Sequence, residues 1–330
     1  MKKILVTGAN GFIGQSLCKT LVIKNKLVHG IVRNSSKVKK HDNIKYSSIS
    51  EINYDTNWIE VLSNTDCVIH CAGRAHIMDK NDKISNETYR SINVEGTIRL
   101  ANQAAEAGVK RIIFLSSIKV NGENTGEPTI GKINNNTNRN YFTHTDKPDP
   151  KDLYGISKLE AEKELWKIAK KTGLEVNILR LPLVYGEGVK GNLNRLLMLV
   201  RSGVPLPFKM IKNQRSMIGL DNLIDLIILC IDHPAAAGKT FLVSDGEDLS
   251  TPDLINHIAH SMGRSARLFP MSISLLRLLG RILNRKEEIN RLTDSLIIDN
   301  QFTKKTLNWF PPHNVSEGIR KMVQSKRNIY

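Results

Sequence analysis

A tyrosine and a lysine stand four positions apart, at Tyr154 and Lys158. In a helix this spacing places both side chains on one face. An ammonium group close to a phenol favours the phenolate and lowers the phenol pKa from about 10, which makes tyrosine a usable acid or base near neutral pH. Ser116 and Ser117 follow an apolar run and supply hydroxyls at the end of a strand. The pattern predicts proton transfer to or from a bound substrate.

A second group of residues predicts a phosphate-binding turn. Gly8, Gly11 and Gly14 follow the first apolar run at the spacing G-x-x-G-x-x-G, with Phe12 and Ile13 between the last two. Glycine is needed where a chain turns sharply, where backbone approaches a pyrophosphate and where a helix start presses on a strand. The free N–H groups of such a helix start bind phosphate. The turn therefore indicates a dinucleotide cofactor.

The end of the second apolar strand bears on which dinucleotide is bound. An acidic residue there accepts hydrogen bonds from the adenosine ribose, but this sequence has Arg33. A guanidinium pairs well with a 2′-phosphate, so the sequence favours NADP(H) over NAD(H). The alternative is that Arg33 only stacks on the adenine. Ser48 and Ile49 are expected to flank the adenine ring.

The elements that must position these residues alternate along the first half of the chain. Strands that are apolar along their whole length are covered on both faces, as in a parallel sheet between helical layers. This pattern predicts an α/β fold built on a doubly wound parallel sheet of the Rossmann type. Strands are expected at 3–7, 27–32, 67–70, 111–115 and 176–180, and helices at 14–24, 88–107 and 153–171.

The domain organisation changes at Pro182. Residues 1–182 are expected to form the dinucleotide-binding domain. Beyond them the elements become shorter and are separated by Gly and Pro, so 183–330 is expected to be mainly a smaller α/β substrate domain, with 216–246 partly rejoining the large sheet. Residues 121–151 are rich in Gly, Asn, Thr, Asp and Pro, which indicates a long surface loop beside the site.

The stretch 273–285 is amphipathic and basic. Such a helix either lies on a membrane surface or packs its apolar face onto the substrate domain, as helices of globular proteins commonly do. The second interpretation is favoured by the sequence.

Composition narrows the possible partners and compartment. Lys and Arg outnumber Asp and Glu by 48 to 32, and the resulting formal charge of +16 attracts anionic small molecules. The excess is distributed along the chain without arginine runs or interleaved aromatics, so nucleic acid is not expected.

Four cysteines in or beside apolar runs suit buried thiols, and no metal site is expected. The N-terminal apolar run is too short for a signal peptide or a membrane span, so we expect a cytoplasmic protein without an integral membrane segment.

Seven motifs, spread in order over nearly the whole chain, resemble those of the extended short-chain dehydrogenases that modify nucleotide sugars, the NAD-dependent epimerase/dehydratase type. The resemblance implies a nucleotide-sugar oxidoreductase with NAD(P)(H) as cofactor, a UDP-sugar as substrate and a homodimer built from helices near 97–107 and 155–170. The matching segments are 7–14 (TGANGFIG), 70–73 (HCAG), 93–97 (NVEGT), 116–122 (SSIKVNG), 154–158 (YGISK), 180–186 (RLPLVYG) and 307–311 (LNWFP).

The same resemblance implies roles for individual residues. Tyr154 is the acid and base at the sugar, assisted by Ser117, while Lys158 tunes Tyr154 and holds the nicotinamide ribose. Asn192 and Arg215 meet the nucleotide diphosphate, and Leu206 and Phe208 line the uracil pocket, although core packing is an equal alternative for those two. The cofactor set implied by the motifs is Gly8, Gly11, Phe12, Ile13, Gly14, Arg33, Ser48, Ile49, Ala72, Gly73, Asn93, Tyr154, Lys158 and Pro182.

Three departures from the family pattern bear on the reaction. Family members that eliminate water carry an Asp-Glu pair after the catalytic hydroxyl, whereas Ile118 and Lys119 stand here, which disfavours a 4,6-dehydratase. Asn121 replaces the usual tyrosine of a Val-Tyr-Gly motif, with no predicted effect. Ser48 replaces a common aspartate near the adenine, which leaves that contact open.

Two enzymatic interpretations remain, both with hydride transfer at C4 of a UDP-hexose or UDP-N-acetylhexosamine. Arg33 favours a reductase of a UDP-4-keto-6-deoxy-N-acetylhexosamine in surface polysaccharide synthesis, and segments 204–208 and 241–250 resemble reductases that form UDP-N-acetylquinovosamine. The alternative is a UDP-glucose or UDP-N-acetylglucosamine 4-epimerase that retains its cofactor. A non-catalytic NADP(H)-sensing protein is a third alternative, but it would have no use for the set Ser117, Tyr154 and Lys158.

Overall fold

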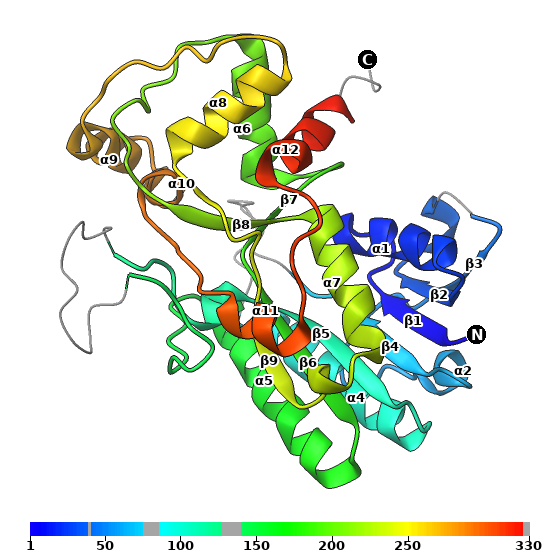
Figure 1. Cartoon of the computed structure of the whole chain (residues 1–330). Helices are drawn as coiled ribbons and strands as arrows, with labels where there is room; N and C mark the ends of the chain where they lie inside the picture. The colour runs from blue at the N-terminus through cyan, green and yellow to red at the C-terminus, as the bar shows by residue number, and fades with distance from the viewer. Residues whose placement is uncertain (39–40, 75–85, 127–139, 326–330) are drawn as a thin grey trace.

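The large sheet contains seven strands, and every neighbouring pair in it is parallel. The computed structural model describes residues 1–38, 41–74, 86–126 and 140–325 (Figure 1). The strand order is β3-β2-β1-β4-β5-β6-β9, so the direction of winding reverses between β1 and β4. The predicted doubly wound Rossmann fold is confirmed. The strands are β1 (Lys3–Thr7), β2 (Leu27–Val32), β3 (Ile44–Ser48), β4 (Cys67–His70), β5 (Arg111–Ser117), β6 (Glu175–Leu181) and β9 (Lys239–Leu242).

Helices cover both faces of this sheet because its strands are apolar on both sides. Alternate residues of one strand enter different cores: Ile4 packs with α1 and α7, whereas Leu5 packs with α4 and α5. Each face therefore excludes water along the whole strand. The helices of this part are α1 (Phe12–Ile23), α2 (Ile59–Leu62), α3 (Asn86–Tyr89), α4 (Gly96–Glu106), α5 (Leu153–Thr172), α7 (Leu220–Asp232) and α11 (Gln301–Leu307).

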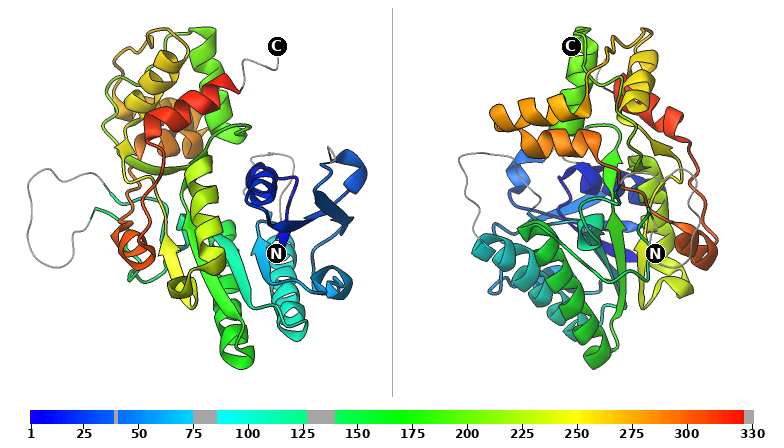
Figure 2. Two further views of the ribbon diagram at one scale, coloured as in Figure 1. Left: turned by 45° about the vertical axis from the view of Figure 1, so that its right-hand side comes forward. Right: turned by 90° about the vertical axis from the view of Figure 1, so that its left-hand side faces the viewer.

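A smaller unit lies at the carboxyl end of the large sheet (Figures 1 and 2). It holds a three-stranded sheet of order β10-β8-β7, in which β7 pairs with β8 in parallel and β10 pairs with β8 antiparallel. A separate apolar core joins its helices to β7 and β8. Its elements are β7 (Leu183–Tyr185), α6 (Gly191–Ser202), β8 (Arg215–Gly219), β10 (Asp248–Leu249), α8 (Thr251–Ser261), α9 (Ile273–Ile282), α10 (Lys286–Thr293) and α12 (Val315–Gln324).

The chain crosses from one unit to the other more than once. It leaves the large sheet after β6, returns through α7 and β9, and then enters the small unit again at β10. The boundaries expected at 1–182 and 183–330 stay a prediction.

Two elements differ in detail from the sequence-based expectation, and a third lies partly outside the described residues. The polar stretch after β2 contains an additional strand, β3, whose residues alternate too weakly to be recognised from the sequence. The helix expected at 88–107 contains a π-helical segment, Arg90–Glu95, and such segments are frequent at functional sites. Of the loop expected at 121–151, residues 127–139 lie outside the described residues.

Membrane-spanning helices, cysteines and metal-binding groups were compared with the expectations from composition. No described helix has the length and apolar character needed to cross a bilayer. The four cysteines are free thiols, of which Cys18, Cys67 and Cys230 are buried. In the described part of the chain no group of His, Cys, Asp and Glu side chains is arranged to hold a metal ion.

Candidate active site

Tyr154 and Lys158 lie in the first two turns of α5, beside the carboxyl end of β5. The helix begins where Asp152 accepts a hydrogen bond from the backbone N–H of Gly155 (2.7 Å), which satisfies one of the free donors at the helix start. Ser117 is the last residue of β5 and is buried. Its hydroxyl accepts from the backbone N–H of Lys119 (3.2 Å) and interacts with the Tyr154 phenol in a way that lowers the phenol pKa. The structure thus brings together the three residues predicted to carry the chemistry.

Lys158 is a buried cation that is held by the sheet. Its Nζ donates to the backbone carbonyl of Leu115 (2.9 Å) and lies 4.4 Å from the ring centroid of Phe114. A cation over an aromatic face is stabilised by the ring quadrupole. Burial lowers the pKa of Lys158 to about 8, and the negative charge of Glu162 opposes this shift. The side chain is therefore fixed in position and close to its titration range.

The expected low pKa of Tyr154 is wrong for the protein without cofactor. Burial raises the pKa of Tyr154 to about 12, and the charge of Asp152 adds to the increase, while the hydrogen bond with Ser117 opposes it. The ammonium of Lys158 does not offset this, because it is directed at Leu115 and Phe114. A working base at this position needs additional positive charge in the site.

Lys119 forms ion pairs beside the catalytic tyrosine. Its Nζ contacts the carboxylate of Asp152 and also that of Glu123 (2.9 Å). Lys119 stands in one of the two positions that carry acidic residues in the dehydratases, so the chain has a cation where that reaction needs an acid or base. The ammonium compensates the Asp152 charge that otherwise raises the Tyr154 pKa.

The three glycines of the predicted phosphate turn are packed around one carbonyl. A Cβ at Gly14 would lie 2.2 Å from the Gly8 oxygen and one at Gly11 would lie 3.0 Å from it, while Gly8 itself has φ +65°. Gly11 precedes α1, which no side chain caps and whose first turn has no acidic residue. A helix start of this kind has donors for phosphate oxygens. The geometry fits the pyrophosphate of a dinucleotide.

Further predicted cofactor residues gather on the neighbouring segment after β4. A Cβ at Gly8 would lie 3.0 Å from the Ala72 nitrogen, and one at Gly73 would lie 3.2 Å from Asn93 Oδ1 and 3.3 Å from Lys158 Nζ. Asn93, in the π-helical segment, donates to the Ser157 hydroxyl (3.0 Å). The segment 71–73 therefore connects the glycine turn with the helix that carries Tyr154.

A chain of hydrogen bonds, not anticipated from the sequence, fixes that segment. The Ala72 N–H donates to Thr7 Oγ1 (3.1 Å), which is 2.7 Å from His70 Nδ1; His70 Nε2 is 3.0 Å from Thr97 Oγ1. The Thr97 hydroxyl donates to the Asn93 carbonyl (2.7 Å), so Nε2 must carry the proton and Nδ1 must accept from Thr7. Burial and the Lys158 charge lower the pKa of His70 to about 3, which keeps the ring neutral.

A buried ion pair anchors the middle of α5 to the sheet. Two nitrogens of the Arg180 guanidinium donate three hydrogen bonds to the carboxylate of Glu162 (2.6, 3.0 and 3.2 Å), and Ser116 donates to the same carboxylate. A third nitrogen of Arg180 donates to Asn121 Oδ1 (2.9 Å). Asn121, the departure without a predicted effect, thus completes the coordination of a buried guanidinium.

The residues predicted near the adenine lie at the ends of β2 and β3. Arg33 is exposed directly after β2, and the Ser48 hydroxyl accepts from the backbone N–H of Ser35 (2.9 Å). Ile49 N–H donates to the Val32 carbonyl (2.9 Å), so both strand ends are joined. Pro182 is buried at the end of β6, next to the strand that carries Ser117.

The residues predicted to bind the substrate are less closely grouped. Leu206 and Phe208 are buried in the core of the small unit. Arg215, at the start of β8, donates to the Asp294 carbonyl (3.0 Å). Asn192 lies in the first turn of α6 and is partly exposed. Their roles towards a substrate stay a prediction.

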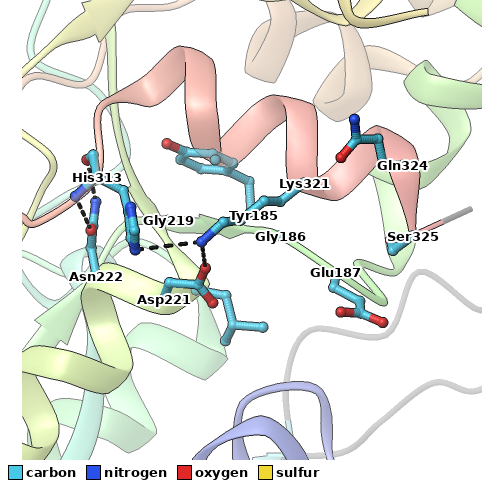
Figure 3. A pocket seen from close by; sticks show the side chains of 12 residues that line it. Tyr185, Gly186, Glu187, Gly219, Asp221, Asn222, His313, Lys321, Gln324 and Ser325 are labelled. Carbon is cyan, nitrogen blue, oxygen red and sulfur yellow. Dashed lines mark hydrogen bonds and ion pairs between the residues drawn. The ribbon is translucent and has the colours of Figure 1, made fainter.

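A cavity of about 540 Å³ lies apart from this constellation, between β7, α7 and α12 (Figure 3). None of the predicted site residues lines it. Three of its lining residues belong to one hydrogen-bond network: Tyr185 and Asn222 each donate to Asp245 (2.7 Å), and Asn222 accepts from the His313 N–H (3.0 Å). These contacts join elements of both units.

Comparison with known proteins agrees with this geometry. A profile of the NAD dependent epimerase/dehydratase family matches residues 4–244. The chain belongs to this family. It is 42% identical to a UDP-glucose 4-epimerase of Vibrio cholerae over 328 residues, which cover 98% of this chain and 95% of that protein. The prediction that the chain is an extended short-chain dehydrogenase, and an NAD-dependent sugar-nucleotide enzyme, is confirmed.

More distant relatives also match this chain over nearly its whole length. The N-acetyl-α-D-glucosaminyl-diphospho-ditrans,octacis-undecaprenol 4-epimerase of Escherichia coli O157:H7 is 25% identical, with 97% of this chain and 94% of that protein covered. The crystal structure of UDP-glucuronic acid 4-epimerase from Bacillus cereus in complex with NAD superposes with a TM-score of 0.77 at 21% identity, covering 99% and 97% of the two chains. The latter similarity supports the fold.

Proposed function

We propose that the protein is a 4-epimerase of UDP-hexoses, with UDP-glucose or UDP-N-acetylglucosamine as substrate. The similarity to the Vibrio cholerae UDP-glucose 4-epimerase over almost the whole chain supports this activity. The observation that carries the proposal is the contact of Ser117 with Tyr154 beside the buried Lys158. Of the two reactions considered from the sequence, the epimerase is now favoured over the reductase.

Tyr154 is the residue that we assign to proton transfer at the sugar O4. Its phenolate oxygen takes the proton of the 4-hydroxyl as C4 loses hydride, and the resulting 4-keto sugar turns within the site. Tyr154 then returns the proton to O4 as hydride reaches the opposite face of C4. Ser117 donates to the sugar oxygen during both transfers, so charge that develops on that oxygen is stabilised.

The proposed cofactor is NAD(H). Gly8, Gly11 and Gly14 would hold its pyrophosphate, and Asn93 and Lys158 would lie near its ribose. Bound NAD supplies the hydride acceptor and donor and, in its oxidised form, a positive charge in the site. Additional positive charge is what the raised pKa of Tyr154 requires. The preference for NADP(H), expected from Arg33, remains a separate proposal that competes with this one.

Incubation with UDP-sugars tests the reaction directly. An epimerase converts UDP-glucose or UDP-N-acetylglucosamine into the C4 epimer with no added reductant, which anion-exchange chromatography or NMR detects. A reductase instead consumes NADPH in equal amount to a 4-keto UDP-sugar. Consumption of NADPH without interconversion of the UDP-sugars contradicts the proposed epimerase activity and restores the reductase.

The assembly is also a proposal. By resemblance to the family, two copies are expected to associate through α4 and α5 in the cytoplasm. Sedimentation velocity tests this assembly, and a monomer at micromolar concentration contradicts it.

A further inference from the structure

Helix α9 has one wide apolar side, and only part of it is buried. Leu276 and Gly280 are buried, and Gly280 packs so closely on Ile289 of α10 that an added Cβ would lie 2.7 Å from its side chain. Packing onto the small unit thus uses only part of the apolar side. The rest of that side and the end of the helix expose Leu275 (44%), Leu278 (51%), Leu279 (38%), Ile282 (69%) and Leu283 (65%).

The exposed side continues beyond the helix. Phe269, three residues before the N-cap of α9, is exposed, and its carbonyl accepts a hydrogen bond from the Lys209 N–H (3.3 Å). Met210, next to Lys209, is half exposed. We call the side chains of Met210, Phe269 and the five exposed residues of α9 and its end the apolar face. Large contiguous apolar surfaces of this kind mark interaction sites.

Positive charge gathers in the two stretches that carry the apolar face, although Arg195 and Arg285 are paired with Glu288 and Arg277 with Asp294. Residues 188–220 and 254–286 each carry six Lys or Arg and no Asp or Glu, so the positive excess is concentrated there and is not evenly distributed. The two stretches meet in the fold, because Arg264 donates to the Arg201 carbonyl (2.7 Å) and Arg267 to the Gly203 carbonyl (3.2 Å). Arg281, within α9 itself, is exposed.

We propose that the apolar face and its basic surroundings dock the protein on an anionic phospholipid membrane. An amphipathic helix with leucines on one side and arginines along its border inserts its leucines between lipid headgroups, while its cations meet lipid phosphates. In Figure 1 α9 lies at the outer edge of the small unit. The protein binds there as a peripheral protein.

Charge distinguishes a membrane from a second copy of this chain. A symmetric contact through the apolar face would bring two basic stretches together, and like charges across an interface are repulsive. An anionic membrane instead supplies the complementary sign. Binding should therefore depend on the lipid charge and weaken as salt increases.

Vesicle sedimentation tests the proposal with the full chain. The wild type is expected to sediment with vesicles of phosphatidylcholine that contain about one third phosphatidylglycerol, and to stay in solution with phosphatidylcholine alone. The variant Leu278→Asp/Ile282→Asp should partition to these vesicles at least about tenfold less than the wild type. Two exposed apolar side chains become negatively charged carboxylates, which do not enter the lipid and are repelled by its phosphates. Arg281→Glu should also reduce partition, by about threefold.

Matched controls separate docking from general changes of surface or fold. Ile59→Asp alters an isoleucine of similar exposure in α2, and Lys110→Glu reverses an exposed charge before β5; both should sediment like the wild type. Circular dichroism and NAD binding report whether each variant is folded. The proposal is overturned if the wild type ignores anionic vesicles, or if folded Leu278→Asp/Ile282→Asp and Arg281→Glu both sediment unchanged. Self-association that is lost in the double variant, without vesicle binding, would assign the face to a second copy instead.

Discussion

Two helices that pack on the large sheet, α1 and α5, begin beside the candidate active site, and they differ in how the free N–H groups of their first turns are satisfied. Helix α1 follows Gly11 and has no side-chain cap. Helix α5 follows Asp152, whose carboxylate accepts from the Gly155 N–H and is itself paired with Lys119. The first helix start leaves donors for an external anion, whereas the second is satisfied from within the chain. The same local element thus leaves free donors at one helix start and satisfies them at the other through a single capping residue.

The largest expected effect is at the open helix start. Gly14→Ala places a Cβ about where the Gly8 oxygen now lies, so the turn must move and the phosphate donors lose their alignment. We expect NAD affinity to fall at least about a hundredfold, measured by isothermal titration calorimetry. Gly108→Ala is the control for backbone strain alone, since Gly108 has φ +76° and no neighbour within 4 Å, whereas Gly14 has no positive φ. Equal losses in both variants would show that a general loss of the fold, not the contact with the Gly8 oxygen, is responsible.

The next effect is at the capped helix. Tyr154→Phe removes the proton-transferring group but keeps the ring, so kcat for epimerisation should fall about 10²- to 10⁴-fold while NAD binding persists. Tyr89→Phe is the matched control, because its ring centroid lies 6.4 Å from that of Tyr154. An unchanged kcat in Tyr154→Phe would remove the proposed mechanism and leave the cofactor-sensing alternative.

A third change tests which dinucleotide the proposed cofactor site prefers. Arg33→Asp replaces an exposed cation at the end of β2 by an acceptor for ribose hydroxyls. The ratio of NADP to NAD affinity should fall about tenfold or more, since a carboxylate repels a 2′-phosphate. Fluorescence titration with both dinucleotides measures the ratio. If it does not change, Arg33 lies away from the adenosine and the sequence-based preference for NADP has no basis.

The smallest expected effect concerns Asp152, the N-cap of α5, whose charge is compensated by Lys119. Lys119→Gln leaves Asp152 uncompensated, which raises the pKa of Tyr154 further, so the acidic limb of the kcat/KM profile should move to higher pH. Activity near neutral pH should fall about threefold. Asp152→Asn retains a capping side chain without the charge and should move the same limb to lower pH. Shifts in the same direction for both variants would contradict this electrostatic account.

The sequence predicts the parts of the site that local geometry determines. The glycine spacing, the strand that precedes it and the pair Tyr154 and Lys158 are each properties of a few neighbouring residues, and the structure places them as the spacing requires. The fold follows from the apolar strands, because such strands need helices on both faces. These expectations depend little on the rest of the chain.

Other parts depend on contacts that no short segment encodes. The pKa of Tyr154 was predicted in the wrong direction because the burial of its phenol, which is the main cause of the raised pKa, is a property of the whole fold. The pairing of Lys119 with Asp152 joins residues 33 positions apart. Glu162 could have been suspected, since it lies four residues beyond Lys158 on the same helix, but its partner Arg180 is on β6.

The neutral imidazole of His70 makes the molecule sensitive to mild acid. The pKa of this ring is about 3 in the folded protein and about 6.5 once the chain unfolds, so the unfolded chain binds the extra proton first. Stability is accordingly complete above that unfolded value and is lost progressively as the solution is acidified towards the folded one. A second ring proton would remove the acceptor that the hydroxyl of Thr7 now uses, and Thr7 in turn holds Ala72. Acidification over that range should therefore lower the free energy of unfolding while the ring of the folded protein stays neutral.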